Sequence, residues 1–414
     1  MKGILVIIDG LGDLPNYQLK GKTPLEAANT PNMDFLATRG EMGYMYTVKP
    51  GFTPGSEHAI LSMFGNNPDA CPRGQIEAVG AGVKLTPGDL VFRVNFGTID
   101  SLERGNVIDR RAGRTLPTKE AKKLAKVINK IEFPYKFEFT PISQHRAVLV
   151  FHGHYVDTIT GNDSTYTHRG GREIEKVEPC LPKDKSIKSR ETAEMVNEFF
   201  DLVYETLKDH PINKKRVMKG LLPANYLFAR GPGSKKPKLV KYKGWISTHA
   251  MPLEVGFSIM SGIKNYPFKY PKLKGFDVYK NLWAGLKKSV EHSKRVIKRN
   301  LKKADYCYVH FKEVDIPGHD NKPFEKKAMI EYIDKYFFKY LCKIAPMNKI
   351  KVVVTGDHST PCKLKAHSSD PVPVLLYNFS LPKEKKHFTE EEARKGALKR
   401  IIGHDFLKKV GFTK

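Results

Sequence analysis

Short apolar runs alternate with amphipathic segments toward both ends of the chain. Three of these runs are rich in β-branched and aromatic residues and predict buried parallel strands: ILVIIDG (4–10), YCYVHF (306–311) and KVVV (351–354). Apolar residues at helical spacing predict one long helix over 278–303 and another over about 323–342.

Two helix starts follow the first predicted strand. In the string TPLE, Thr23 is placed as an N-cap, Pro24 takes the first helical position, and Glu26 stands three residues after the cap. Thr30 and the proline after it repeat the start signal, and Gly40 supplies the stop. The alternation of strands and helices predicts an α/β fold with a mainly parallel sheet covered by helices on both faces.

The middle of the chain has a different pattern. The strings FRVNFGTI and HRAVLVFHGHYVDTIT, together with several Gly-rich turns, predict the hairpins of an α+β unit. We predict that residues 76–189 form a smaller domain, inserted into a core made of residues 1–75 and 190–414. The basic segment 231–244 is predicted to be a solvent-exposed connection.

Length and composition narrow the class of protein. The chain has 414 residues, which is enough for two or three domains without disulfide bonds. No apolar run approaches the roughly 18 residues that a membrane span needs. The five cysteines form no CxxC pair and indicate reduced thiols. We expect a cytoplasmic protein with no membrane partner, whose oligomeric state the sequence leaves open.

The net charge is unusual at +27, with 71 Lys and Arg against 44 Asp and Glu. Such a charge attracts anions, either nucleic acid, an anionic membrane surface or a small phosphorylated metabolite, although a lysine-coated surface without a partner is equally compatible with it. The sequence contains no paired Cys/His finger, no RNP motif and no basic region beside a heptad repeat, so no specific nucleic-acid partner is expected.

Acidic and histidine residues follow all three predicted strands. Their positions are Asp9 after the first strand, Asp315 and His319 in KEVDIPGHD after the second, and Asp357 and His358 in TGDHSTP after the third, with His367 nine residues further on. Ligands of open α/β sheets bind at the carboxyl ends of strands, where these side chains can converge. Mixed carboxylate and imidazole groups suit Mn²⁺ or Zn²⁺, and Mg²⁺ less well. The pattern predicts a site for two metal ions.

A serine motif adds a candidate nucleophile. In TPGSEHAILSMFG, Ser56 is predicted to be the N-cap of a helix, where unpaired backbone N–H groups and the helix dipole favour a phosphoryl group. Beside a metal ion, a serine hydroxyl can lose its proton and attack at neutral pH. No GxGxxG string occurs, and Asn16 stands where a phosphate-binding loop ending at Thr23 would need its first glycine.

Arginines cluster in the predicted insert. DRRAGR contributes Arg110, Arg111 and Arg114, and SQHR contributes Arg146. Guanidinium groups bind carboxylates and phosphates in a bidentate way. Further anion-binding candidates are Arg73, Arg230 and Lys312. Together with the serine and the metal-ligand types, these residues indicate phosphoryl transfer on a small phosphorylated substrate.

Taken together, ILVIIDGLGD, TPLEAANTPNMDFLA, TPGS, EAVGAGVKLTPGDLVFRVNF, DRRAGR, HRAVLV, KGLLPANYLFARG, KEVDIPGHD, TGDHSTP and KAHSSDPVPVLL resemble the archaeal-type cofactor-independent phosphoglycerate mutases of the alkaline phosphatase superfamily. The resemblance runs from residue 1 to near the C-terminus and is weaker at about 155–185 and 234–280. It implies an alkaline-phosphatase-like core and the interconversion of 3-phosphoglycerate and 2-phosphoglycerate, in glycolysis and gluconeogenesis, through a phosphoserine.

The resemblance also implies roles for individual residues. Ser56 would be the nucleophile; one ion would be held by Asp315, His319 and His367, and the other by Asp9, Asp357, His358 and Ser56. The substrate would be bound by Asp109, Arg110, Arg111, Arg114, His145, Arg146, Arg230 and Lys312. The ions would be Mn²⁺ first, with Zn²⁺, Co²⁺ or Mg²⁺ as alternatives, and no 2,3-bisphosphoglycerate would be needed.

Two stretches depart from the family pattern. The family usually has Gly-Ser-Asp with a histidine four residues after the serine, whereas this chain has Glu57, His58 and Ile60. The family's Asp-Thr-Asp-Pro stretch is replaced near GNDSTYTHRGG (161–171). A phosphatase or phosphomutase of the same superfamily acting on another phosphorylated metabolite is therefore an alternative. A nucleic-acid-associated binding protein that uses the +27 charge is a second alternative.

Overall fold

The computed structural model describes residues 1–163, 176–235, 237–271 and 277–413. They form two compact units. The first comprises Met1–Ala70, Leu239–Ala250 and Ser258–Lys414, and the second Cys71–Lys238 and Met251–Phe257.

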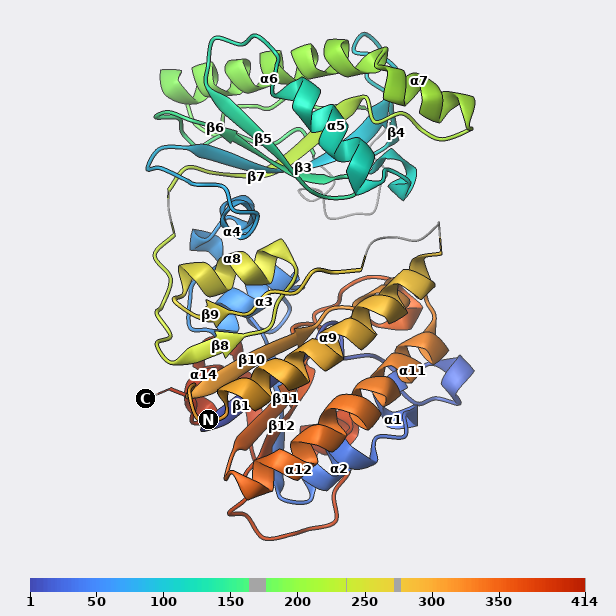
Figure 1. The fold of residues 1–414 in the computed structure, drawn as a ribbon, viewed down its shortest axis with the longest axis vertical. Helices are drawn as coiled ribbons and strands as arrows, with labels where there is room; N and C mark the ends of the chain where they lie inside the picture. The colour runs from blue at the N-terminus through green and yellow to red at the C-terminus, as the bar shows by residue number, and fades with distance from the viewer. Residues whose placement is uncertain (164–175, 236, 272–276, 414) are drawn as a thin grey trace. The chain divides into compact units, whose positions relative to one another are not determined.

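The first unit is built on an eight-stranded sheet with the order β13-β2-β12-β11-β1-β10-β8-β9. Figure 1 labels β9, β8, β10, β1, β11 and β12 of this sheet. Its strands are β1 (Gly3–Ile8), β2 (Gly40–Tyr46), β8 (Trp245–Ser247), β9 (Lys264–Asn265), β10 (Tyr306–Phe311), β11 (Lys351–Thr355), β12 (Val372–Tyr377) and β13 (Lys399–Ile402). All neighbours pair in parallel except those of β12, which is antiparallel to both β11 and β2. This confirms the prediction of an α/β fold with a mainly parallel sheet.

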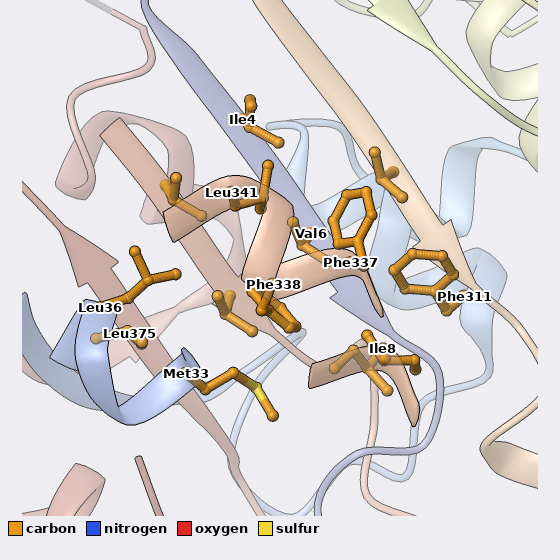
Figure 2. Packing of buried hydrophobic residues seen from close by; sticks show 14 of the residues in the cluster. Ile4, Val6, Ile8, Met33, Leu36, Phe311, Phe337, Phe338, Leu341 and Leu375 are labelled. Carbon is orange, nitrogen blue, oxygen red and sulfur yellow. The ribbon is translucent and has the colours of Figure 1, made fainter. Parts of the chain in front are cut away.

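Helices of the first unit cover this sheet. They are α1 (Pro24–Ala27), α2 (Pro31–Ala37), α3 (Ser56–Met63), α9 (Val278–Asn300), α10 (Asp315–His319), α11 (Pro323–Ile333), α12 (Lys339–Met347), α13 (Glu390–Lys395) and α14 (Phe406–Lys409). Figure 2 shows how side chains of β1, α2 and α12 interlock in the core. Ile4, Val6 and Ile8 of β1 are all fully buried, and Phe337, Phe338 and Leu341 pack beside them.

The predicted helix over 323–342 is interrupted. Helix α11 passes through a π-helical turn (Asp334–Phe338) into α12, which ends at Met347. The turn places the buried Asp334 carboxylate at the start of α2, where it accepts hydrogen bonds from the backbone N–H groups of Asn32 and Met33. Thr30 and Pro31 stand at the predicted start of α2, but the Thr30 side chain makes no capping hydrogen bond. A carboxylate distant in sequence caps the helix instead. The Thr23–Glu26 capping box of α1 is confirmed.

The second unit is an antiparallel sheet with helices. Its strands are β3 (Leu90–Ile99), β4 (Val107–Asp109), β5 (Phe137–Ser143), β6 (Arg146–Phe151) and β7 (Tyr226–Gly233). Its helices are α4 (Arg73–Gly80), α5 (Thr118–Ile128), α6 (Ile187–Lys208), α7 (Pro211–Met218) and the first part of α8 (Pro252–Met260). Alternate residues of β3 face opposite layers: Phe92 packs in the cluster with α5 and α6, and Val91 packs with Ala78 of α4.

This unit extends beyond the predicted insert of residues 76–189. Strand β7 pairs with β3, and α6 contributes Phe199 and Val203 to the same core, so the compact unit continues to Lys238. The basic segment predicted as a connection over 231–244 begins inside β7, which ends at Gly233.

Glu390 yields a prediction about stability. It is 9% exposed, its Oε2 accepts a hydrogen bond from Thr23 Oγ1 at 2.7 Å, and burial raises the pKa of its carboxyl to about 8. Between its unfolded pKa, near 4.5, and 8, the folded state holds a proton that the unfolded chain has released. Stability should therefore fall as the pH rises through this window.

Glu390→Gln removes this titrating group. As the pH rises from 5.5 to 8, the free energy of unfolding of the variant should therefore increase relative to that of wild type by roughly 1–3 kcal/mol, at about 1.36 kcal/mol per pKa unit. Urea denaturation followed by tryptophan fluorescence measures it, because Trp245 and Trp283 both lie in the first unit. Glu391→Gln, which changes the exposed neighbour, is the control. Parallel pH curves for wild type and Glu390→Gln would contradict the assignment.

Candidate functional site

Three adjacent strands bring the predicted ligands together. β1 lies between β10 and β11 and is parallel to both, so their carboxyl ends share one edge. Asp9 follows β1, α10 follows β10 with Asp315 as its first residue, and Asp357 follows β11. The backbone N–H of Gly10 donates to Asp357 Oδ1 at 3.1 Å, which joins the first and third loops.

Among the described residues, two groups have the geometry to hold a metal ion. The first consists of Asp9, His310 and Asp357, all buried. His310 Nε2 lies 3.7 Å from Asp9 Oδ2 and 3.5 Å from Asp357 Oδ2, and its Nδ1 lies 3.1 Å from Tyr308 Oη. The sequence interpretation did not include His310, because it stands inside the apolar run YCYVHF. A histidine inside a strand buried on both faces is the signal that could have found it.

The second group consists of Asp315, His358 and His367. His367 Nε2 lies 3.7 Å from Asp315 Oδ1, and His319 Nε2 lies 3.3 Å from Asp315 Oδ2. Each of these two imidazoles uses its Nδ1 on a backbone carbonyl, that of Pro54 at 2.9 Å for His367 and that of Lys365 at 3.1 Å for His319. A carbonyl can only accept, so Nδ1 carries the proton and Nε2 is directed at the carboxylate.

His358 lies between the two groups. The resemblance implied that it joins Asp9 and Asp357, and its Nε2 lies 3.2 Å from Asp9 Oδ1 and 3.5 Å from Asp357 Oδ2. Its ring also stacks on that of His367, with centroids 3.7 Å apart, and it groups geometrically with Asp315. The two predicted ligand sets therefore form one continuous cluster.

Ser56 reaches the same cluster from α3. Its Oγ lies 3.4 Å from His358 Nε2 and accepts a hydrogen bond from Lys312 Nζ at 3.0 Å. The prediction that Ser56 is the N-cap was wrong, because Gly55 takes that position and Ser56 is the first helical residue. His58 Nδ1 accepts the N–H of Gly55 at 3.3 Å. The serine hydroxyl is therefore directed at the cluster while His58 completes the helix start.

Opposite charges balance the buried carboxylates. Burial disfavours ionisation of Asp315 and Asp357, yet nearby histidines hold the pKa of both carboxyls below the ordinary value, with Lys312 also contributing at Asp357. Burial lowers the pKa of His358, but Asp357 and the other carboxylates raise it to about 9. Lys312 Nζ forms an ion pair with Asp9 and lies 4.0 Å from Asp357 Oδ2. The cluster thus already attracts cations.

A buried lysine supports the loops that carry these ligands. Lys326 of α11 is fully buried, and its three donors reach Asp13 Oδ2 at 2.8 Å, the Thr360 carbonyl at 3.0 Å and the Gly12 carbonyl at 3.3 Å. An ammonium group has three N–H donors, so this one is fully satisfied. The loop after β1 and the loop after β11 are thereby joined beneath the ligand cluster.

Apart from Lys312, which lies in the first unit, the predicted anion-binding residues belong to the second unit. His145 is 5% exposed, and burial followed by the charges of four arginines lowers its pKa to about 2. These arginines are Arg146, Arg111, Arg93 and Arg114. Arg110 and Arg230 both form ion pairs with the buried Asp163, the latter at 3.8 Å. His145 is therefore neutral and lies within a strongly positive region.

Asp109 shapes the loop that carries these arginines. Its Oδ1 accepts the N–H groups of Arg111 at 2.6 Å and Gly113 at 2.9 Å, which holds DRRAGR in a tight turn. Glu77 and Arg93 were not predicted from the sequence. Arg93 Nε lies 3.3 Å from Glu77 Oε2, and Arg73 Nε lies 2.7 Å from Glu77 Oε1. Of the departing stretch 161–171, residues 164–171 lie outside the described part of the chain.

The fold and the cluster define the class of protein: a mixed α/β protein that carries metal-ligand residue types beside a serine at the carboxyl ends of parallel strands. In the part of the chain that the structure describes, every helix is too short or too polar to cross a membrane. Residues 37–213 match the family model described as 2,3-bisphosphoglycerate-independent phosphoglycerate mutase.

Relatives match over nearly the whole length. The 2,3-bisphosphoglycerate-independent phosphoglycerate mutase of Pyrococcus furiosus is 39% identical over 412 residues, which is 98% of this chain and 95% of that protein. The 2,3-bisphosphoglycerate-independent phosphoglycerate mutase 1 of Archaeoglobus fulgidus is 36% identical over 421 residues, which is 98% of this chain and 96% of that protein. The chain belongs to the 2,3-bisphosphoglycerate-independent phosphoglycerate mutase family, whose members are isomerases.

Solved structures agree. A Pyrococcus horikoshii protein superposes with a TM-score of 0.78 at 31% identity, covering 100% of this chain and 98% of that one. The cofactor-independent phosphoglycerate mutase of Thermoplasma acidophilum gives a TM-score of 0.62 at 28% identity, covering 100% and 99%.

Glu77 yields a second prediction. It is 5% exposed, and the charges of Arg73 and Arg93 outweigh its burial and lower its pKa. Glu77→Gln leaves the 9%-exposed Arg93 without its counter-charge, which should cost roughly 3–5 kcal/mol. Hydrogen exchange of the α4 and β3 amides in the full chain should show this loss.

The matched control is Glu205→Gln, which breaks the exposed pair with Lys208 on α6 of the same unit. It should change exchange protection by less than about 1 kcal/mol. Equal protection of α4 and β3 in the two variants would contradict the role given to Glu77.

Proposed function

We propose that this chain interconverts 3-phosphoglycerate and 2-phosphoglycerate through a phosphoserine on Ser56, at a site that holds two divalent metal ions. Membership of the family supports the reaction. The observation that carries the mechanism is the position of Ser56 Oγ, 3.0 Å from Lys312 Nζ and 3.4 Å from His358 Nε2, at the edge of the ligand cluster.

The residues present fit a pair of divalent ions. Carboxylate and neutral imidazole are the donors that Mn²⁺, Zn²⁺ and Co²⁺ accept, and two of the histidines already direct Nε2 at Asp315. The ligands proposed are Asp9, Ser56, Asp315, His319, Asp357, His358 and His367, with His310 as an additional candidate for the Asp9 group. When bound, the ions supply charge that polarises phosphoryl oxygens and favours the serine alkoxide. Mn²⁺ is our first candidate.

The proposed reaction moves the phosphoryl group between the two hydroxyls of glycerate in two steps, through Ser56. Ser56 Oγ bonds to phosphorus while the bond from phosphorus to the substrate oxygen breaks, and the serine proton passes to the released glycerate hydroxyl. The other hydroxyl of glycerate then attacks the phosphoserine, gives up its proton, and restores the Ser56 hydroxyl. Lys312 donates to Ser56 Oγ and offers positive charge to the phosphoryl group.

We propose that the second unit binds the anionic substrate. Arg110, Arg111, Arg114, Arg146 and Arg230 supply guanidinium groups. Burial and then the charges of Arg146, Arg111, Arg93 and Arg114 lower the pKa of His145, so this region is strongly positive. Guanidinium forks hold carboxylate and phosphate groups in fixed orientations, so glycerate can be retained between the two steps. Asp109 contributes by holding the loop of these arginines.

Ser56→Ala tests this proposal. Because the nucleophile is lost, turnover of 3-phosphoglycerate should fall by at least about 10³-fold, while the full chain still binds the ions through its remaining ligands. The assay is phosphorus NMR of wild type and variant after chelation and addition of Mn²⁺, Zn²⁺, Co²⁺ or Mg²⁺ in turn. Ser62→Ala, which removes a hydroxyl from the same helix outside the cluster, is the matched control.

The same spectra separate the alternatives. Formation of 2-phosphoglycerate by wild type supports the mutase. Accumulation of inorganic phosphate without 2-phosphoglycerate would show a phosphatase, and full activity of Ser56→Ala would rule out the phosphoserine.

A further inference from the structure

Thr360 touches all three loops that carry the ligands of the first unit. It follows β11 by five residues, is fully buried, and its hydroxyl lies 2.7 Å from Asp315 Oδ1 and 3.0 Å from His358 Nδ1. We propose that Thr360 is a positioning residue that couples the two proposed metal-binding groups, an inference that rests on the proposed metal site.

The direction of these hydrogen bonds follows from donor counting. A hydroxyl has a single proton, and the carboxylate of Asp315 only accepts, so Thr360 Oγ1 donates to Asp315. Its oxygen then accepts from His358, which requires Nδ1 of that ring to carry a proton. His358 Nε2 is thereby directed toward Asp9 Oδ1, 3.2 Å away. The Thr360 hydroxyl therefore orients the Asp315 carboxylate and also the His358 imidazole, which lies between the two proposed metal-binding groups.

Two glycines, Gly10 and Gly318, allow the neighbouring backbone to approach Thr360 closely. Gly10 has φ of +63°, and a Cβ on it would lie 2.7 Å from Thr360 Oγ1 and 2.9 Å from Asp315 Oδ1. A Cβ on Gly318 of α10 would lie 2.5 Å from the Thr360 carbonyl oxygen and 2.8 Å from its Cγ2. Only glycine allows the loop after β1 and the helix after β10 to approach the threonine this closely.

The main chain of Thr360 is fixed as firmly as its side chain. Its N–H donates to the Gly12 carbonyl at 3.0 Å, and its carbonyl accepts from the buried Lys326 at 3.0 Å. The hydroxyl therefore has little freedom to leave Asp315 and His358. Hydrogen bonds of this kind to ligating side chains set ring tautomer and orientation, and their loss typically weakens metal binding 10–100-fold.

Thr360→Val tests the inference, because valine keeps the shape and removes the hydroxyl. Mn²⁺ binding to the full chain is measured by the electron paramagnetic resonance signal of the free ion. At least one dissociation constant should rise about 10–100-fold in Thr360→Val, and Thr360→Ser should return to within about threefold of wild type. The melting temperature in chelator is recorded alongside to detect purely structural damage.

Thr248→Val is the matched control, because Thr248 is also buried and its hydroxyl bonds to Ser293 instead of a proposed ligand. It should lower the melting temperature in chelator as Thr360→Val does, yet leave Mn²⁺ binding unchanged. If Thr360→Val does not fold, the Mn²⁺ dissociation constants of Thr360→Ala and Thr360→Ser are compared instead.

Mn²⁺ binding by Thr360→Val equal to that of Thr248→Val would overturn the positioning role and leave the metal site standing. A wild-type chain that holds neither Mn²⁺ nor any of Zn²⁺, Co²⁺ and Mg²⁺ would overturn both this inference and the two-ion part of the proposed function.

Discussion

The first unit is organised around the burial of like charges. Asp9, Asp357 and Asp315 lie at one edge of a sheet, and ionised carboxylates in such a place repel each other unless cations are close. The protein supplies Lys312 and a His358 whose pKa is raised to about 9. Because β1 is parallel to both β10 and β11, their carboxyl ends bring Asp9 together with Asp315 and Asp357, which are more than 300 positions away in the sequence.

The second unit presents the complementary case. Here guanidinium groups are concentrated around two buried carboxylates, Glu77 and Asp163. Burial, followed by the charges of nearby arginines, keeps His145 neutral by lowering its pKa. Such a region favours a ligand that carries more than one negative charge, which is what a phosphorylated acid offers. Under the proposed activity, part of the net charge of +27 serves to attract this substrate.

Local signals in the sequence predicted the local structure well. Strand β10 matches its predicted span, and the capping box of α1 is present, because both depend on neighbouring residues. The strand ends also indicated Asp9, Asp315 and Asp357 as candidate ligands, and the structure places all three at one edge of the sheet. His310 was hidden, since a histidine inside an apolar strand looks like part of the core. The extent of the second unit depends on the pairing of β7 with β3, a contact between distant segments that periodicity cannot show.

The start of helix α3 gives a structural role to His58, one of the residues near Ser56 that depart from the family pattern. With Gly55 as the N-cap, the N–H of Gly55 needs an acceptor, and His58 Nδ1 provides it. An imidazole used in this way is tied to the backbone, so it does not compete with the ligand histidines for the cluster. Ser56, one residue into the helix, keeps its hydroxyl for Lys312 and His358. His58 therefore holds the start of the helix, while the oxygen of Ser56 faces Lys312 and His358.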